Sequence, residues 1–449
     1  MNGCRLLQTE LSRKLYQETA KDLPLIDYHN HLSVKELAED RRYGDIAEGW
    51  LLNDPYKHRA MRICGVDEHY ITGNASNEEK FHMWCQTLPR LIGGPLYDWS
   101  RDEMEQIFGI RTPLNGDNAS RLWAEANEKI ASPEFSARGI FRQFNVEYSS
   151  PIAALTDDLS GFAALSVLAP SLRGDNLLLP GKQLLQELED ATGRKIRSCA
   201  DYESAISLRL DTMHHAGCRF SDHSLDRSFR YTPKSEAGAF RTSDIADHDK
   251  WDAASRQAFS SHMLRFLAGE YAKRGWTMQL HLGAQRFTST RLRILSGATG
   301  GYAGIGSPLD IQMLVSLLDD IEQSESGLPR MILYPLNPGD NATISILSGS
   351  FIGVTQGPAW WWCDHLQGMR DMLETFSTFS VLSTFVGMNT DSRSFLSLLR
   401  HDYFRRTFCR WIADKAQQGD IPEDYDALRM VTEAVCYSNA KKMIMGVQK

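Results

Sequence analysis

The sequence lacks the marks of several protein classes. No run of about 18 apolar residues occurs in the 449-residue chain, so no membrane-spanning helix is predicted. The first residues, through Asp22, are polar and charged and contain no apolar stretch typical of a signal peptide. The eight cysteines are thinly spread and form no CxxC pair. Reduced thiols in a cytoplasmic protein are therefore favoured over a disulfide framework.

Excess positive charge, internal repeats and low-complexity segments are also missing. The formal net charge of −8 argues against a general nucleic-acid binder. Hydrophobic residues make up 42% of the chain, which is ordinary for a globular protein. The length allows several domains, but one large enzyme domain with an insertion fits equally well.

Short apolar runs recur along the chain and alternate with stretches of helical periodicity. Eight runs are predicted to be strands, at 23–27, 144–149, 163–169, 218–221, 277–282, 331–336, 351–355 and 382–388. Helices are expected between several of them, at 181–191, 201–216, 252–274, 308–323 and 364–377. This alternation predicts an α/β fold, a (β/α)8 TIM barrel, with a doubly wound open sheet as the alternative.

The pattern changes between the first two predicted strands. Apolar residues there recur at helical spacing, and few β-branched runs occur. Asp54 followed by Pro55 predicts the N-cap and first residue of a helix, and Ser76 with Glu79 predicts a capping box. We expect an N-terminal helix and first strand at 1–32, a helical insertion at 33–141, and the rest of the barrel with C-terminal helices at 142–449.

Chemically active side chains follow the first and last predicted strands. His29 and His31 lie two residues apart, so on an extended strand they project from one face and form half of a divalent-metal site. Ordinary polar residues at a strand end are the alternative. In a closed barrel the eighth strand adjoins the first, which puts Asp391 beside both histidines. A His-His-Asp set leaves open positions for a catalytic metal. The alternative is that Asp391 or Ser392 caps the following helix.

Other strand ends supply further candidates. Arg173 follows the third strand, and its guanidinium fork suits a substrate carboxylate. His281 lies in the fifth strand, either in the site or as a buried, hydrogen-bonded histidine. Trp360 and Trp361 belong to a run of three tryptophans that cannot all face one core, so at least one is expected to line a pocket. The charged cluster at 400–406 is expected to be a solvated or interface face.

Six stretches give the chain a resemblance to a known family. They are residues 27–32, 56–62, 70–76, 279–284, 332–338 and 385–396, and the last continues into 400–406. In order and spacing they resemble the uronate isomerase family, also called glucuronate isomerase, of the amidohydrolase superfamily. The resemblance implies a (β/α)8 barrel with a helical insertion. It also implies interconversion of D-glucuronate with D-fructuronate, or of D-galacturonate with D-tagaturonate, by proton transfer between C2 and C1.

The same resemblance implies roles for individual residues. His29, His31 and Asp391 match the metal site, and we expect one divalent ion there, Zn²⁺ or alternatively Mn²⁺. Residues that match positions contacting substrate or assisting proton movement are Tyr56, Arg173, Trp360, Trp361 and Arg393. We expect Asp391 to be the general base, Tyr56 to relay a proton at a sugar hydroxyl, Arg393 to orient the base or a substrate oxygen, and His281 to lie at the substrate.

The chain departs from the family pattern where the mouth of the site is expected. Pro55 stands where the family usually has His, and His58 where it has Trp; segment 287–290 lacks the usual asparagines, and 297–306 lacks acids. The preferred substrate therefore stays open. A metal-dependent hydrolase of the same superfamily, an isomerase of another sugar acid and a non-catalytic sugar-acid binder are the alternatives. We expect a sugar acid as partner, no nucleic acid or membrane, and a homo-oligomer.

Overall fold

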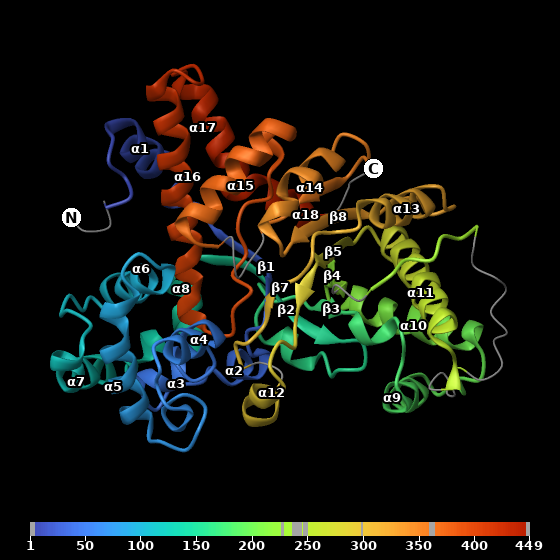
Figure 1. Cartoon of the computed structure of the whole chain (residues 1–449), viewed down its shortest axis with the longest axis horizontal. Helices are drawn as coiled ribbons and strands as arrows, with labels where there is room; N and C mark the ends of the chain where they lie inside the picture. Colours follow the sequence, from blue (N-terminus) through green and yellow to red (C-terminus); the bar gives the residue numbers. More distant parts are fainter. Residues whose placement is uncertain are drawn as a thin grey trace.

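A parallel sheet surrounded by helices organises the chain (Figure 1). The structure is a computed structural model that describes residues 5–225, 229–235, 245, 250–297, 300–358 and 364–445. Its seven-stranded sheet has the order β1-β2-β3-β4-β5-β8-β9, and every neighbouring pair is parallel. The strands are β1 (Leu25–Asn30), β2 (Val146–Ala154), β3 (Ser171–Arg173), β4 (Phe220–Leu225), β5 (Thr277–Leu282), β8 (Arg330–Pro335) and β9 (Val354–Gln356). The predicted α/β class is confirmed.

Two of the eight predicted strands were wrong. Within 163–169, residues up to Ala164 belong to a 3-10 helix, and the third strand comes later, at Ser171–Arg173. Within 382–388, residues Leu382–Thr384 form another 3-10 helix, and no strand follows in this segment. Gly387 has a φ of 75°, a left-handed conformation that interrupts an extended backbone. The sheet of the described chain therefore has seven strands.

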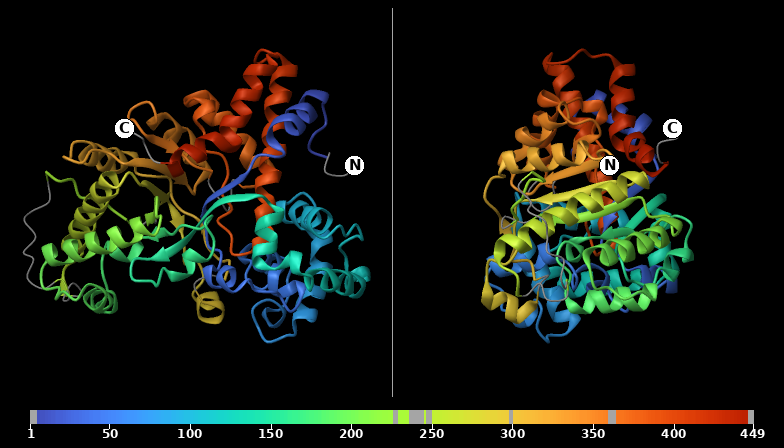
Figure 2. Two further views of the ribbon diagram at one scale, coloured as in Figure 1. Left: turned by 180° about the vertical axis from the view of Figure 1, so that it is seen from behind. Right: turned by 90° about the vertical axis from the view of Figure 1, so that its right-hand side faces the viewer.

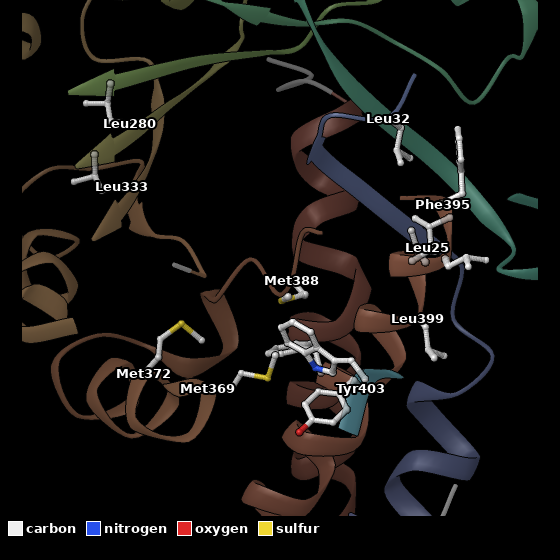
Figure 3. Packing of buried hydrophobic residues seen from close by; sticks show 14 of the residues in the cluster. Leu25, Leu32, Leu280, Leu333, Met369, Met372, Met388, Phe395, Leu399 and Tyr403 are labelled. Carbon is white, nitrogen blue, oxygen red and sulfur yellow. The ribbon is translucent and has the colours of Figure 1, made fainter. Parts of the chain in front are cut away.

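The segment after Thr384 nevertheless lies against β1. The backbone N–H of Asp391 donates to the carbonyl oxygen of His29 at 3.1 Å, and that of His31 donates to the carbonyl oxygen of Ser392 at 2.9 Å. Val386 packs into the cluster inside the sheet, whereas Met388 packs outside it (Figure 3). In a regular strand, residues two apart point to the same face, so Val386 and Met388 on opposite sides show that the strand pattern breaks at Gly387.

One core lies inside the curl of the sheet and a second lies between the sheet and its helices. Inside, Tyr28 of β1 stacks on Phe220 of β4 with ring centroids 5.8 Å apart, and Tyr334 of β8 joins the same cluster. Outside, Leu280 of β5 and Leu333 of β8 belong to the larger core (Figure 3). Both faces of the sheet are thus buried, as a parallel sheet requires.

The helices that follow the strands agree with the predicted ranges to within a few residues. They are α9 (Lys182–Thr192), α10 (Cys199–His215), α11 (Ala253–Lys273), α13 (Ile311–Glu322) and α15 (Leu366–Phe379), and α14 (Asn341–Leu347) is a further helix that was not predicted. The C-terminal helices are α16 (Leu399–Gln418), α17 (Tyr425–Glu433) and α18 (Asn439–Met445). Helix α1 (Glu10–Leu15) packs beside α16, so segments from the two ends of the chain lie together (Figures 1 and 2). In the described ranges, no helix is long and apolar enough to cross a membrane.

Between β1 and β2, the described chain forms helices and connecting loops but no strand. They include α2 (Val34–Glu39), α3 (Ile46–Trp50), α4 (Pro55–Ile63), α5 (Asn77–Thr87), α6 (Pro95–Asp102), α7 (Ala119–Ile130) and α8 (Ala137–Gln143). Figure 1 shows these helices gathered in blue and teal at one side of the sheet. The predicted caps are confirmed, because Asp54 accepts hydrogen bonds from the backbone N–H groups of Tyr56 and Lys57, and Ser76 forms a capping box with Glu79. The division into domains at residues 32 and 141 stays a prediction.

The prediction that the charged cluster at 400–406 is a solvated or interface face was wrong, because most of its residues are buried within the chain. Arg405 is buried and donates to the carbonyl oxygens of Leu23 and Pro24, each at 2.8 Å. Arg406 is also buried, and it pairs with Asp102. These guanidinium groups satisfy backbone and carboxylate acceptors inside the protein, so the cluster fastens α16 to the start of β1 and to α6.

Asp27 is expected to be the main polar support of the segment beside β1. Its buried carboxylate accepts hydrogen bonds from the N–H of Thr390 at 2.8 Å, from the hydroxyl of Thr390 at 2.7 Å and from the amide of Asn30 at 2.9 Å. Asp27→Ala removes the partner of both Thr390 donors, whereas the Asn30 amide keeps Ser149 and the Asp27 carbonyl, so it should lower the free energy of unfolding by about 3 kcal/mol. Urea unfolding measures this change. The exposed-helix control Asp190→Ala should stay within about 0.5 kcal/mol, and an Asp27→Ala loss no larger than that would contradict the assignment.

Candidate active site

A cavity of about 280 Å³ opens at the carboxyl ends of the strands. Its volume lies near the lower end of the range for small-molecule sites, about 300 Å³. The ends of β1, β3, β4 and β5 supply one part of its lining, and the start of α4, the chain after β5, residues 391–393 and Arg400 of α16 (Leu399–Gln418) supply the rest. Five lining residues are arginines, namely Arg59, Arg173, Arg286, Arg393 and Arg400.

His29, His31 and Asp391 meet in this cavity. Oδ1 of Asp391 lies 2.9 Å from Nε2 of His31 and 3.2 Å from Nε2 of His29. Asp391 has a φ of 45°, a left-handed conformation that is rare outside glycine and concentrates at functional sites. The alternative of a helix cap was wrong for Asp391, because Ser394 is the residue that precedes the next helix (Phe395–Leu398).

A second group adjoins the first and shares His29. Oδ1 of Asp222 lies 2.7 Å from Nδ1 of His281, and Oδ2 of Asp222 lies 3.1 Å from Nη1 of Arg173. The His281 ring stacks on Tyr334 with centroids 4.5 Å apart. Ligand-type atoms of His29, Asp222 and His281 all lie within 4.8 Å of one another, as do those of the first group.

Both carboxylates of these groups are held ionised. Burial alone would raise the pKa of Asp391, but the adjoining His29 and His31 lower it below its ordinary range. Burial likewise opposes the charge of Asp222, yet His281, His29 and Arg173 hold its pKa well below the usual value. Each group therefore offers an anionic ligand at neutral pH.

The two groups have the chemistry of a divalent-metal site. Burial lowers the pKa of His31, which favours the neutral imidazole that binds metals. Nδ1 of His29 is buried and has no hydrogen-bond partner in the described part of the chain. Imidazole nitrogens and carboxylate oxygens are ligands for zinc and similar ions, so these residues fit a divalent cation.

A third polar group lies in the cavity wall beside the start of α4. Tyr56 follows the N-cap Asp54 by two residues, and its hydroxyl donates to Oδ2 of Asp364 at 2.8 Å. The guanidinium carbon of Arg400 lies 5.2 Å from the Tyr56 ring centroid. Arg393 also lines the cavity, and among the described acids none lies within salt-bridge distance of it. The wall thus offers a phenol and two guanidinium groups to a ligand.

The mouth is formed by the chain that follows β5. Phe287, Tyr302 and Ala303 line the cavity near the short ribbon of β6 (Ala284–Gln285) and β7 (Gly304–Ile305). Gly301 has a φ of 73°, and a Cβ there would lie 2.2 Å from the carbonyl oxygen of Pro55. Only glycine allows this close approach, so the segment seals against the start of α4.

The structure brings most of the predicted site residues together. The residues that line the one cavity are His29, His31, Tyr56, Arg173, His281, Asp391 and Arg393. Trp360 and Trp361 lie outside the described residues. Sequence reasoning gave no role to Asp222, Asp364 or Arg400. The position of Asp222 after a strand was a usable signal, and that of Asp364 two residues after the tryptophan run was a weaker one.

Comparison with known proteins identifies the family. The model of the glucuronate isomerase family matches residues 1–444. The chain belongs to the glucuronate isomerase family. Uronate isomerases of Mannheimia succiniciproducens and Bacillus subtilis are 40% and 38% identical to it, each over 97% of this chain and over 97% and 96% of their own. The resemblance found in the sequence is confirmed.

Solved structures of the family share the whole fold. The uronate isomerase of Thermotoga maritima superposes with a TM-score of 0.92 and 25% identity, over 99% of both chains. The glucuronate isomerase of Caulobacter crescentus gives a TM-score of 0.90 over 100% of this chain and 98% of its own, at 22% identity. The arrangement of sheet, insertion and C-terminal helices is therefore that of this family.

The His-His-Asp group predicts metal binding that depends on its histidines. His29→Ala and His31→Ala should each weaken binding of a divalent ion by at least about 100-fold, since even an outer partner of a ligand contributes about 10- to 100-fold. Elemental analysis after dialysis measures the retained metal. His215→Ala is the control, because His215 is an exposed residue of α10 and lies outside the cavity lining. Full metal content in His29→Ala would remove His29 as a ligand.

Proposed function

We propose that the protein interconverts D-glucuronate with D-fructuronate, D-galacturonate with D-tagaturonate, or both, by proton transfer between C2 and C1 of the open-chain sugar acid. The observation that carries this function is membership of the glucuronate isomerase family over residues 1–444. A metal-dependent hydrolase is not favoured, because the full-length relatives are uronate isomerases.

The charge of the cavity supports an anionic substrate. Its lining holds five guanidinium groups against the carboxylates of Asp54, Asp222 and Asp391. Guanidinium forks bind carboxylates in a bidentate way, so a sugar acid has several places for its charged end. We assign the substrate carboxylate to the side of Arg173. Because Arg173 already shares its charge with Asp175 and Asp222, the neighbouring Arg286 is expected to assist it.

The proposed metal ligands are His29, His31 and Asp391, with Zn²⁺ as the ion and Mn²⁺ as the alternative. A bound divalent ion supplies Lewis acidity at the sugar oxygens that it touches. His281 contributes to substrate contact, held in orientation by Asp222 on one ring nitrogen. Trp360 and Trp361 are assigned to the sugar face from the family resemblance alone.

Asp391 is the proposed general base. Its lowered pKa keeps it ionised at neutral pH, and it would accept the C2 proton of a bound sugar when it is released from, or only weakly bound to, the metal. Arg393, two residues on, is assigned to orient Asp391 or a substrate oxygen. Tyr56 is assigned to relay a proton at a sugar hydroxyl, because its phenol lines the same cavity.

The segment 385–391 is proposed to take the place of the eighth strand, which would make the curled sheet a (β/α)8 barrel. Its hydrogen bonds to His29 and His31 and the packing of Val386 inside the curl support this. A cytoplasmic location and a homo-oligomeric state, without nucleic-acid or membrane partners, stay predictions.

Isomerisation predicts exchange of the C2 proton with solvent. In heavy water with glucuronate or galacturonate, the protein should form the keto acid, and the returned aldose should carry deuterium at C2. Proton NMR follows both events in one tube. Absence of turnover with every hexuronate, together with hydrolysis of an acyl substrate, would contradict the isomerase function and favour the hydrolase.

Replacing the proposed base should abolish turnover while the fold stays intact. Asp391→Asn preserves shape and removes the proton acceptor, so it should lower kcat by at least about 10²- to 10⁴-fold. The control Asp310→Asn alters an exposed helix cap that is not part of the cavity lining and should keep near-full turnover. Steady-state kinetics with circular dichroism distinguishes activity from folding. Near-full turnover of Asp391→Asn would show that another residue is the base.

A further inference from the structure

The guanidinium group of Arg173 is held by a carboxylate that lies outside the cavity. Oδ2 of Asp175 accepts a hydrogen bond from Nε of Arg173 at 2.9 Å and lies 2.7 Å from Nη2. Arg173 lines the cavity, whereas Asp175 is not among the described residues that line it, and the Asp175 side chain is 32% exposed. Asp175 therefore contacts Arg173 rather than a ligand in the cavity.

Asp175 is itself fixed on the neighbouring strand β4. The backbone N–H of Ser224 donates to Oδ1 of Asp175 at 2.5 Å, so the two carboxylate oxygens have separate partners. The N–H of Gly174 donates to the carbonyl oxygen of Asp222 at 2.9 Å. A Cβ at Gly174 would lie 2.2 Å from Cε1 of the buried His223, so only glycine lets the chain pass this close to β4. The turn that carries Asp175 is thus fastened to β4 through its backbone and its side chain.

The remaining hydrogen-bond capacity of Arg173 suits a carboxylate. A guanidinium group carries one N–H on Nε and two on each Nη nitrogen. Oδ2 of Asp175 takes the N–H of Nε and one N–H of Nη2, and Oδ2 of Asp222, 3.1 Å from Nη1, takes one there. Within the described chain, one N–H on each Nη nitrogen is left, and a carboxylate can accept such a pair in a bidentate way.

We propose that Asp175 is a positioning residue that fixes the Arg173 guanidinium so that its remaining N–H bonds meet the substrate carboxylate. The proposal rests on the proposed function, in which Arg173 holds that carboxylate. A long, flexible side chain loses rotamer entropy when it binds a ligand, and an anchor that is present before binding removes part of this cost. Without Asp175, Arg173 keeps only Asp222 as a carboxylate partner and can turn about that contact.

The negative charge of Asp175 by itself predicts the opposite effect on substrate binding. An anion near the assigned place of the substrate carboxylate repels it, so removal of the charge alone would lower KM. Loss of the anchor instead raises KM. Because Asp175 is partly exposed, solvent and salt screen its repulsion, whereas its hydrogen bond to Arg173 acts at contact. Positioning is therefore expected to dominate, and the sign of the change in KM distinguishes the two effects.

Steady-state kinetics of Asp175→Ala and Asp175→Glu with a hexuronate test the proposal. Asp175→Ala removes the anchor and should raise KM by about 10-fold. Asp175→Glu keeps the charge but displaces the carboxylate by the length of a methylene group, so it should raise KM by at least about 3-fold. Both variants should keep kcat within about 2-fold of the wild type, because the carboxylate end of the sugar is remote from the proton transfer between C2 and C1.

A double-mutant cycle and a matched control show whether the effect passes through Arg173. Arg173→Met should raise KM by about 10²-fold, and in that background Asp175→Ala or Asp175→Glu should add less than about 2-fold. Asp157→Ala is the control, because Asp157 also follows a strand and accepts a backbone N–H, that of Ala154 at 2.7 Å, but lies outside the cavity lining. It should leave kcat and KM near wild type. Thermal melting followed by circular dichroism checks the fold of every variant.

The outcomes separate this inference from the proposed function. A lowered or unchanged KM in either Asp175 variant, an equal rise in both backgrounds, or a loss confined to kcat would overturn the positioning role. If Asp175→Ala does not fold, Asp175→Glu decides by the same criteria. If Arg173→Met raises KM but the Asp175 variants do not, this inference fails while the proposed function stands. If Arg173→Met keeps the wild-type KM, or the wild type turns over no hexuronate, the role assigned to Arg173 fails and the inference falls with it.

Discussion

The candidate site depends on one long-range contact, between β1 and a segment about 360 residues later in the chain, as the partners Asp27 and Thr390 show. The buried Asp27 carboxylate binds the backbone and side chain of Thr390, and the next residue is Asp391. A buried charge that satisfies several donors is costly to break, so this contact fixes the segment firmly. With the segment fixed, the left-handed turn at Asp391 directs its carboxylate onto His29 and His31. Placement of the proposed base and metal ligands is therefore a consequence of packing at the edge of the sheet.

A second constraint is charge compensation around the cavity. Asp222 lies between His281 and Arg173, and Tyr56 lies between Asp364 and Arg400. Each buried acid thus lies next to a basic group or a phenol, which lowers the desolvation free energy of burying its charge. Excess guanidinium groups remain toward the cavity, and they give the site a preference for an anionic sugar. The substrate preference of this chain is expected to depend on the mouth, where Gly301 and Tyr302 replace the acidic segment usual in the family.

Local patterns in the sequence were sufficient for much of the fold and for the centre of the site. Asp54 before Pro55 predicted where α4 begins, and therefore where Tyr56 stands. The spacing of His29 and His31 predicted two imidazoles that project from one face of the strand end. These features rest on contacts between near neighbours in sequence, which propensity and spacing describe well.

The failures have a common physical origin in tertiary contacts. Residues 382–388 are apolar and β-prone, but one left-handed glycine at 387 ends the strand pattern. In the sequence, Arg400 and Arg405 look like solvent-facing residues of a helix. Only the folded structure shows that Arg400 lies over the Trp99 ring and that Arg405 donates to the carbonyl oxygen of Leu23. Asp364 could not be linked to Tyr56 because the two are about 300 residues apart and no local rule pairs them.

The most direct test is the location of a bound ion. Crystals of the protein grown with zinc and measured at the zinc absorption edge show the ion by its anomalous scattering. We predict one peak about 2.0–2.2 Å from Nε2 of His29, Nε2 of His31 and a carboxylate oxygen of Asp391. A fully loaded crystal with its zinc peak elsewhere, or with Asp391 turned away from both histidines, would contradict the proposal that the segment beside β1 builds the site.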